Sequence, residues 1–282
     1  MIISSDDFTV ADLLKGDLKL ATPPNIYFAL KQIVDDPTKG SQDAAFLIED
    51  DAALSAKLLK IVNSAFYGFP SQITSITRAM SLIGLRELQN LVLSTLIVER
   101  FSNLPGQSYS IHDFWARNLR CAILSRELDK LMGNKYADSA FLCGLLHNIG
   151  QLLFYLRLPE LARQVELLSQ SQIHIDRLTL INIEQQIIGF DHYHAGAELC
   201  RLWKLPEVFI ESICLHAYSD YIGPYSDIAA IIRLADNFSS LEHPYDALNY
   251  SSMNLSIEQI DYALEMTNEE FESIFKIFYP VK

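Results

Sequence analysis

The histidines are the residues of this chain whose type and surroundings could do chemistry. His147 lies in FLCGLLHNIGQLLF, an apolar segment with helical periodicity. A buried imidazole there must be hydrogen-bonded, bound to a metal or directed into a cavity, and a hydrogen-bonded structural histidine is the commonest case. His192 and His194 in GFDHYHAGAEL are two residues apart, so a helix directs them to different sides. At most one of these two faces any site that contains His147.

Two further groups come later in the chain. His216 ends the apolar segment PEVFIESICLH, and Asp236 lies among apolar residues in IIRLADNF. Taken singly, His216 is expected to bond the last carbonyls of its helix, and Asp236 is expected to form an ordinary ion pair. If the fold brings four side chains together, they form a nitrogen and oxygen donor set for one divalent transition metal: His147, His192, His216 and Asp236.

Other catalytic motifs are absent from the sequence. It contains no Walker A loop, no GxGxxG, no GxSxG and no HExxH, so the mechanisms tied to these motifs have no anchor. The cysteines at 121, 143, 200 and 214 stand in apolar segments without CxxC spacing, and we interpret them as buried, reduced thiols. Trp115 and Trp203 have no interleaved basic residues and are expected in the core rather than stacked on bases.

Composition narrows the class of protein. Half of the 282 residues are hydrophobic and 20% are charged, which predicts a compact globular chain. The net charge of -13 repels phosphate backbones and anionic headgroups, so nucleic acid is not an expected partner. The start MIISSDDFTVADLL is acidic and no apolar run approaches about 18 residues, so we expect a cytoplasmic protein without a membrane span.

The segments that must position these groups have helical periodicity almost throughout, which predicts an all-α fold. Pro23 and Pro24 can open a helix that Asp36 and Pro37 close, Asp50 or Asp51 can cap a second, and Ser75 can cap a third. Gly144 and Gly150 are expected to pack closely without breaking their helix. Further helices are expected over residues 41–49, 85–101, 112–131, 138–156, 159–169, 178–188, 192–202 and 206–216.

Two features of the predicted organisation concern connections and the tail. The turn-forming segment SNLPGQSYS, residues 102–110, is the candidate boundary between two helical layers. Residues 225–282 are expected to add about four helices, one of which would begin at the acidic stretch Asn268, Glu269 and Glu270.

Several long segments resemble an HDOD domain. IEDDAALSAKLLKIVNSAFYG and ITSITRAMSLIGLRELQNLVL resemble its N-terminal half, although Ala52 stands where a proline is usual. The resemblance continues through FWARNLRCAILSREL and FLCGLLHNIGQLLF to IEQQIIGFDHYHAGAELCRLWKLPEVFIESICLH. It implies an HD-like multi-helix bundle with an HDOD domain over residues 20–216, divided into an N-terminal helical part at 20–101 and a degenerate HD-like part at 111–216. Residues 217–282 would then be a helical extension that completes or covers the HD-like core, or that forms a homodimer surface.

The HDOD family is related to the HD-superfamily metal-dependent phosphohydrolases. The resemblance implies that in active HD enzymes an early His, an adjacent His-Asp pair and a later Asp bind a metal that activates water. Here Arg117 stands at or beside the first position, and the pair reads His147-Asn148, so a carboxylate is replaced by an amide that binds hard cations more weakly. Asp236 matches the last position. We therefore expect no catalytic residue and no cofactor, with one divalent transition metal as the alternative.

Arg117 suggests how the site has changed. Our hypothesis is that its guanidinium partly replaces the metal and is directed at Asp236 and the Asn148 carbonyl, while the histidines at 147, 192 and 216 complete a hydrogen-bond network. The alternative is that Arg117 points to solvent and that water or apolar side chains fill the residual pocket.

The resemblance implies a nonenzymatic signal-transduction or regulatory module that contacts other signalling proteins, such as members of bacterial cyclic-dinucleotide or two-component pathways. One alternative is a metal-dependent phosphohydrolase with a reduced, one-metal site. Another is a sensor that binds a small anion or nucleotide in the residual pocket, with Arg117 as the anchor.

Overall fold

The computed structural model describes residues 9–15, 25–102, 110–172, 176–239 and 253–279, and in these residues it contains helices and no strands. This confirms the all-α prediction. The first part of the chain forms α1 (Val10–Leu13), α2 (Asn25–Asp35), α3 (Ser41–Glu49), α4 (Ala52–Val62), α5 (Ile76–Ile83) and α6 (Leu85–Ser102). The remainder forms α7 (Ile111–Leu131), α8 (Ala140–Leu146), α9 (Ile149–Arg157), α10 (Pro159–Gln170), α11 (Arg177–Ile187), α12 (His192–Leu202), α13 (Glu207–Leu215), α14 (Ser226–Ser239) and α15 (Ile257–Phe278).

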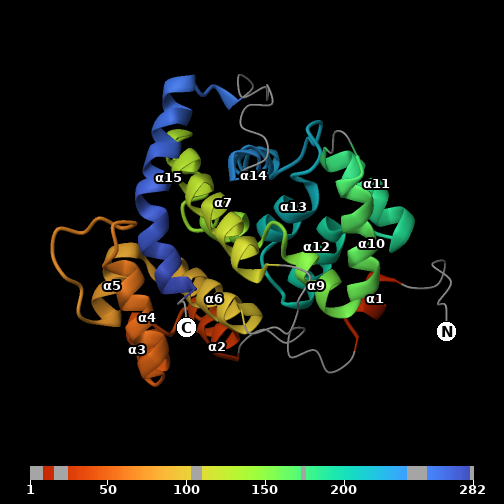
Figure 1. Cartoon of the computed structure of the whole chain (residues 1–282). Helices are drawn as coiled ribbons and strands as arrows, with labels where there is room; N and C mark the ends of the chain where they lie inside the picture. The colour runs from red at the N-terminus through yellow and green to blue at the C-terminus, as the bar shows by residue number, and fades with distance from the viewer. Residues whose placement is uncertain (1–8, 16–24, 103–109, 173–175, 240–252, 280–282) are drawn as a thin grey trace.

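Helix α7 is the central element of the fold. Figure 1 shows α2 to α6 on one side of the molecule and α9 to α13 on the other, with α7 between them and α15 alongside α7. α7 packs against α8, α14 and α15, which are distant from one another in sequence. Trp115 on α7 and Trp203 after α12 are both buried, as predicted. The cysteines form no disulfide, and three are buried, whereas Cys214 is only partly buried.

Local side-chain chemistry begins several of these helices where the sequence predicts it. The Ser75 hydroxyl accepts a hydrogen bond from the Arg78 N–H at the start of α5, and the Asp51 carboxylate accepts one from the Leu54 N–H at the start of α4. Gly84, with φ of +87°, ends α5, and α6 then leaves at 116° to it. These caps and turns place α4, α5 and α6 against one another.

The helix predicted over residues 138–156 is instead two helices, α8 and α9, with a break at His147 and Asn148. The Nδ1 atom of His147 lies 2.6 Å from the carbonyl oxygen of Gly144. In a continuous helix that carbonyl accepts from the N–H of Asn148, four residues later. Because the imidazole bonds this carbonyl instead, the backbone turns and directs the two side chains inward.

The glycines on either side of this break allow close packing, as predicted. A Cβ atom at Gly144 would lie 2.7 Å from Cα of Ala122 on α7. A Cβ atom at Gly150 would lie 1.9 Å from the carbonyl oxygen of His192 on α12. α8 and α9 can therefore approach α7 and α12 only with glycine at these two positions.

The described part of the tail after residue 225 forms two helices, and residues 240–252 and 280–282 lie outside the described residues, so the predicted number of four is not tested. The predicted helix start at Asn268 is wrong. The stretch Asn268 to Glu270 lies inside α15, because Ser256 and Gln259 form a capping box that begins this helix three turns earlier. Glu270 is buried, 3.7 Å from Arg126 on α7. Most of the boundary predicted at 102–110 lies outside the described residues.

Among the described helices, none alone has both the length and the hydropathy needed to cross a bilayer. Two bent combinations of helices reach those limits, and they do so by length and composition only. The first joins α5 to α6, and the second joins α8 and α9 to α10.

Glu270 gives the fold a measurable pH dependence. Burial, together with the nearby Glu127 carboxylate, raises its pKa to about 7, while Arg126 opposes the shift. Because the unfolded pKa is about 4.3, the folded state keeps a proton that the unfolded state loses as the pH rises between these values. This group therefore lowers the free energy of unfolding as pH rises from about 4 to 7.

We predict that Glu270→Gln is more stable than the wild type at pH 8 by about 2 kcal/mol, whereas the two proteins differ little at pH 4.5. Urea unfolding at the two pH values measures the difference. Glu272→Gln, at an exposed position on the same helix, serves as the control and should show no such pH-dependent gain. Equal pH dependence in wild type and Glu270→Gln would contradict the prediction.

Candidate functional site

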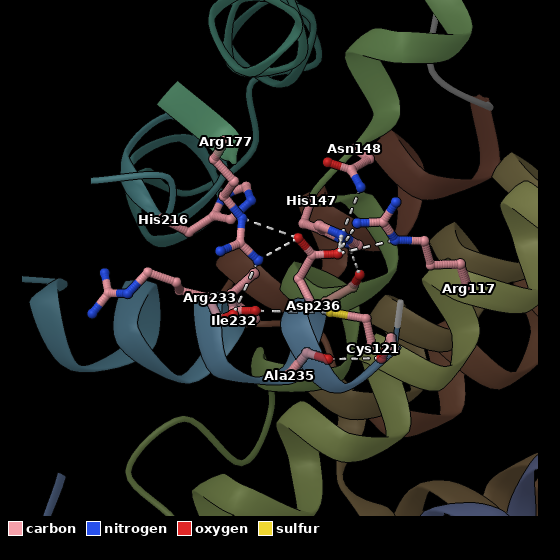
Figure 2. Close-up of polar contacts among 12 residues, drawn as sticks. Arg117, Cys121, His147, Asn148, Arg177, His216, Ile232, Arg233, Ala235 and Asp236 are labelled. Carbon is pink, nitrogen blue, oxygen red and sulfur yellow. Dashed lines mark hydrogen bonds and ion pairs between the residues drawn. The ribbon is translucent and has the colours of Figure 1, made fainter. Parts of the chain in front are cut away.

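A buried carboxylate lies at the centre of the candidate site. Asp236 on α14 has a side chain that is only 2% exposed. Arg117 from α7 donates to its Oδ1 through Nη2 at 2.8 Å and Nε at 3.2 Å. Arg177 from α11 donates to its Oδ2 through Nη2 at 2.6 Å and Nε at 3.2 Å. Figure 2 shows the two guanidinium groups converging on this one carboxylate from opposite sides.

The contact predicted between Arg117 and Asp236 is therefore present, whereas Arg177 was not among the predicted site residues. Arg177 is the first residue of α11, whose N-cap is Asp176. A cation is opposed by the helix dipole at this position. A positive charge at a helix N-terminus is the one signal in the sequence that Arg177 has an anionic partner outside its own helix. That partner is Asp236, 59 residues later in the chain.

His147 connects the carboxylate to the break between α8 and α9. Its Nδ1–H donates to the Gly144 carbonyl. Its Nε2 lies 2.9 Å from Oδ1 of Asp236 and 2.8 Å from Nδ2 of Asn148. The Nε2 atom therefore has the Asp236 carboxylate, an acceptor, and the Asn148 amide, a donor, both within hydrogen-bond distance.

His192 extends the network to a second carboxylate. Its Nδ1 lies 2.8 Å from Oε2 of Glu184 on α11, and the same oxygen accepts from the His192 backbone N–H at 2.9 Å. Its Nε2 lies 3.2 Å from Oδ1 of Asn148, the oxygen that we expected to face Arg117. His194 is half-exposed, with 54% of its side chain accessible. His192 is therefore the histidine of this pair that faces the site, and Glu184 is a partner that the sequence analysis missed.

His216 also lies in the cluster, where its ring centroid is 5.5 Å from that of His147. Its Nδ1–H donates to the carbonyls of Ser212 and Ile213 in the last turn of α13. Its Nε2 is buried and has no hydrogen-bond partner in the described structure. Burial first, and then the charges of His147 and Arg177, hold the pKa of His216 well below its usual range. The ring is therefore neutral and presents a bare nitrogen lone pair.

The charges around Asp236 keep it ionised. Burial by itself raises the pKa of this carboxyl, but the charges of Arg117, Arg177 and His147 outweigh burial and hold the pKa well below its usual range. Arg177 responds in the opposite sense: burial disfavours its charge, but Asp236 holds its pKa above the usual value. The site is a buried anion held between two cations rather than a neutral acid available for proton transfer.

The donor set is a poor match for a divalent metal ion. In the described part of the chain, no three His, Cys, Asp or Glu side chains are arranged to hold one. Each oxygen of Asp236 already faces a guanidinium, so a divalent ion bound at either oxygen would meet a positive charge. Asn148 adds a neutral amide where a carboxylate would attract such an ion. What the arrangement supports chemically is a set of ion pairs and hydrogen bonds that leaves Nε2 of His216 without a partner among the described residues.

Comparison with solved structures shows the same fold in proteins from several bacteria. A Geobacter sulfurreducens HDOD domain protein of unknown function is 21% identical, has a TM-score of 0.78, and is matched over 96% of this chain and 97% of its own. A Shewanella amazonensis SB2B protein provisionally named a phosphohydrolase is 22% identical, with a TM-score of 0.72 and coverage of 90% and 93%. A Marinobacter aquaeolei VT8 protein provisionally named a signal transduction protein is 21% identical, with a TM-score of 0.68 and coverage of 91% and 58%.

The sequence itself gives two further matches. An uncharacterized protein of Treponema pallidum (strain Nichols) is 29% identical over 261 residues, which are 90% of this chain. These residues match 49% of that protein, so the chain spans about half the length of this relative. The HDOD domain family matches residues 20–218, which is more than half of the chain. This chain therefore belongs to the HDOD domain family.

Proposed function

We propose that this chain is a nonenzymatic signal-transduction module that acts through contacts with other proteins, and that two arginines occupy the place of the metal in its HD-like core. The observation that carries the proposal is the position of Arg117 and Arg177 on the two oxygens of Asp236. A carboxylate engaged in this way has no oxygen left for a metal or a reacting water. Other signalling proteins are then the partners of the module.

The charges of the cluster support a structural role for it. Asp236 joins α14 to α7 through Arg117 and to α11 through Arg177, and these residues are 119 and 59 positions apart. A metal ion would join helices in the same way, through shared coordination of distant side chains. Guanidinium groups perform this function with a permanent charge and directed N–H groups. The core then keeps its shape without a bound metal.

The name of one structural relative also supports a role in signal transduction. The Marinobacter relative carries a provisional signal-transduction name, and its chain extends well beyond the matched part. A module of this kind is expected to pass information through its surface to other domains or proteins, because its polar core is closed by internal contacts.

A second candidate function is metal-dependent phosphohydrolase activity with one ion. It is favoured by the orientation of His147 and His216, whose Nδ1–H groups are fixed by backbone carbonyls so that both Nε2 atoms point into the site. Metal-binding histidines are commonly oriented in this way. The provisional name of the Shewanella relative agrees with this alternative.

Metal content separates the two functions. We predict that tag-free protein purified without chelator contains far less than about one equivalent of Fe, Mn, Ni or Zn, and that His147→Ala and Asp236→Asn leave this content unchanged. Inductively coupled plasma mass spectrometry provides the measurement. About one equivalent of a single metal in the wild type, lost in both variants, would reject the proposal and favour the phosphohydrolase.

The role of Asp236 in stability gives a second prediction. Asp236→Asn leaves two guanidinium groups without their shared anion, so we expect the free energy of unfolding to fall by about 3 kcal/mol. Asp227→Asn is the matched control on the same helix, because Asp227 forms an exposed ion pair with Lys135 and its loss should cost less than about 1 kcal/mol. Urea unfolding of the three proteins measures both effects. Equal stability of the two variants would show that the cluster does not hold the core together.

A further inference from the structure

A pocket lies apart from the cluster around Asp236. It has a volume of about 940 Å³ and opens between α4, α6, the start of α7 and the end of α15. In Figure 1 the C-terminal end of α15 reaches the region of α4 and α6, and these helices are in contact. The pocket shares no lining residue with the site described above. Its volume lies within the range of about 300–1,000 Å³ that is typical of small-molecule sites.

Positive charge gathers in this pocket although the chain as a whole is acidic. Lys57 and Lys60 of α4 and Lys276 of α15 line it, which is three of the eleven lysines in a chain of net charge -13. Two carboxylates also line it, those of Asp51 and Glu99. The three ammonium groups exceed these two carboxylates by one, so the lining carries a net positive charge that favours an anion.

The lysines are only weakly neutralised by the protein itself. Among the described residues, the nearest carboxylate oxygen to Lys57 Nζ belongs to Glu99 and is 3.9 Å away, beyond hydrogen-bond distance, although the Lys57 side chain is only 19% exposed. Burial lowers the pKa of Lys57, as expected for an ammonium group with too few partners. The Lys276 ammonium lies 3.7 Å from Glu272, and the Asp51 carboxylate accepts from the Leu54 backbone N–H.

Apolar and aromatic side chains form the rest of the pocket. Leu54 and Leu96 line it beside Phe278 and Tyr279 at the end of α15. His112 at the start of α7 also lines it and meets the Tyr279 ring edge to face, with 5.6 Å between centroids. A ligand that fits these walls combines a flat apolar ring system with a strongly anionic group.

We propose that this pocket binds a nucleoside phosphate, with its phosphates on Lys57, Lys60 and Lys276 and its base against the apolar walls. Phosphate oxygens supply charge-assisted acceptors for these ammonium groups, to which the described residues give no hydrogen bond. The volume suits one such molecule, and its binding would connect α4 to α15. The proposal goes beyond the proposed function because it gives the module a small-molecule input remote from Asp236.

Isothermal titration of the full chain with ADP and with GDP tests the proposal. We expect at least one of these nucleotides to bind at one site per chain, and to bind more tightly than either inorganic pyrophosphate or the corresponding nucleoside. Absence of binding by both nucleotides would overturn the proposal. Pyrophosphate binding as tightly as the better nucleotide would also overturn it, because the apolar walls would then contribute nothing.

Variants locate the binding in the pocket. Lys57→Met keeps the apolar stem and should weaken binding at least about tenfold. Because Lys57 is partly buried, the double variant Lys60→Gln with Lys276→Gln, both at exposed positions, tests the same claim without disturbing packing and should weaken binding at least about threefold. Lys39→Gln, at an exposed lysine outside the pocket, is the control and should bind as the wild type does. Unchanged affinity in both pocket variants, with folding verified by circular dichroism, would overturn the assignment.

Discussion

The negative charge of Asp236 is the constraint on which the rest of the core depends. A carboxylate buried to this extent must be balanced by cations or protonated. In this chain two guanidinium groups and an imidazole surround it, and they come from α7, α11 and the junction of α8 and α9. Helices that meet at one charge are fixed relative to one another, which accounts for the central position of α7 and for the packing of α14 against it.

The junction between α8 and α9 shows how local structure serves this constraint. The imidazole of His147 bonds the Gly144 carbonyl, interrupts the helix and directs its other nitrogen at Asp236. Asn148 then lies between His147 and His192, and the amide bonds a ring nitrogen on each side. Glu184 bonds the other ring nitrogen of His192 and ends the network on that side. The resulting network runs through groups that each have a directed partner, and the bare Nε2 of His216 is the exception within it.

The sequence was sufficient to predict the fold class and most helix boundaries, whereas for Arg117 it left two alternatives, of which the structure shows the contact with Asp236. Caps such as Ser75 and Asp51 act on N–H groups within the next turn, so their effect is visible locally. Arg177 and Glu184 were missed because their partners lie on other helices and no periodic pattern records such a pairing. The break at His147 was missed for a related reason. The His147 side chain, instead of the Asn148 backbone N–H, bonds the Gly144 carbonyl, and no periodic pattern records this exchange. The acidic stretch ending at Glu270 suggested a helix start, but the capping box of Ser256 and Gln259 begins α15 three turns earlier.

The proposed function requires that Arg117, Arg177 and Asn148, and not a distortion of the fold, set this core apart from a metal-binding one. The most direct test is the affinity for Mn²⁺, measured by electron paramagnetic resonance, of the wild type and of the variant Arg117→His with Asn148→Asp. The account predicts at least about tenfold tighter binding by the variant, because it regains an imidazole and a carboxylate and loses a fixed cation. Wild-type protein that binds Mn²⁺ as tightly as the variant would contradict the account.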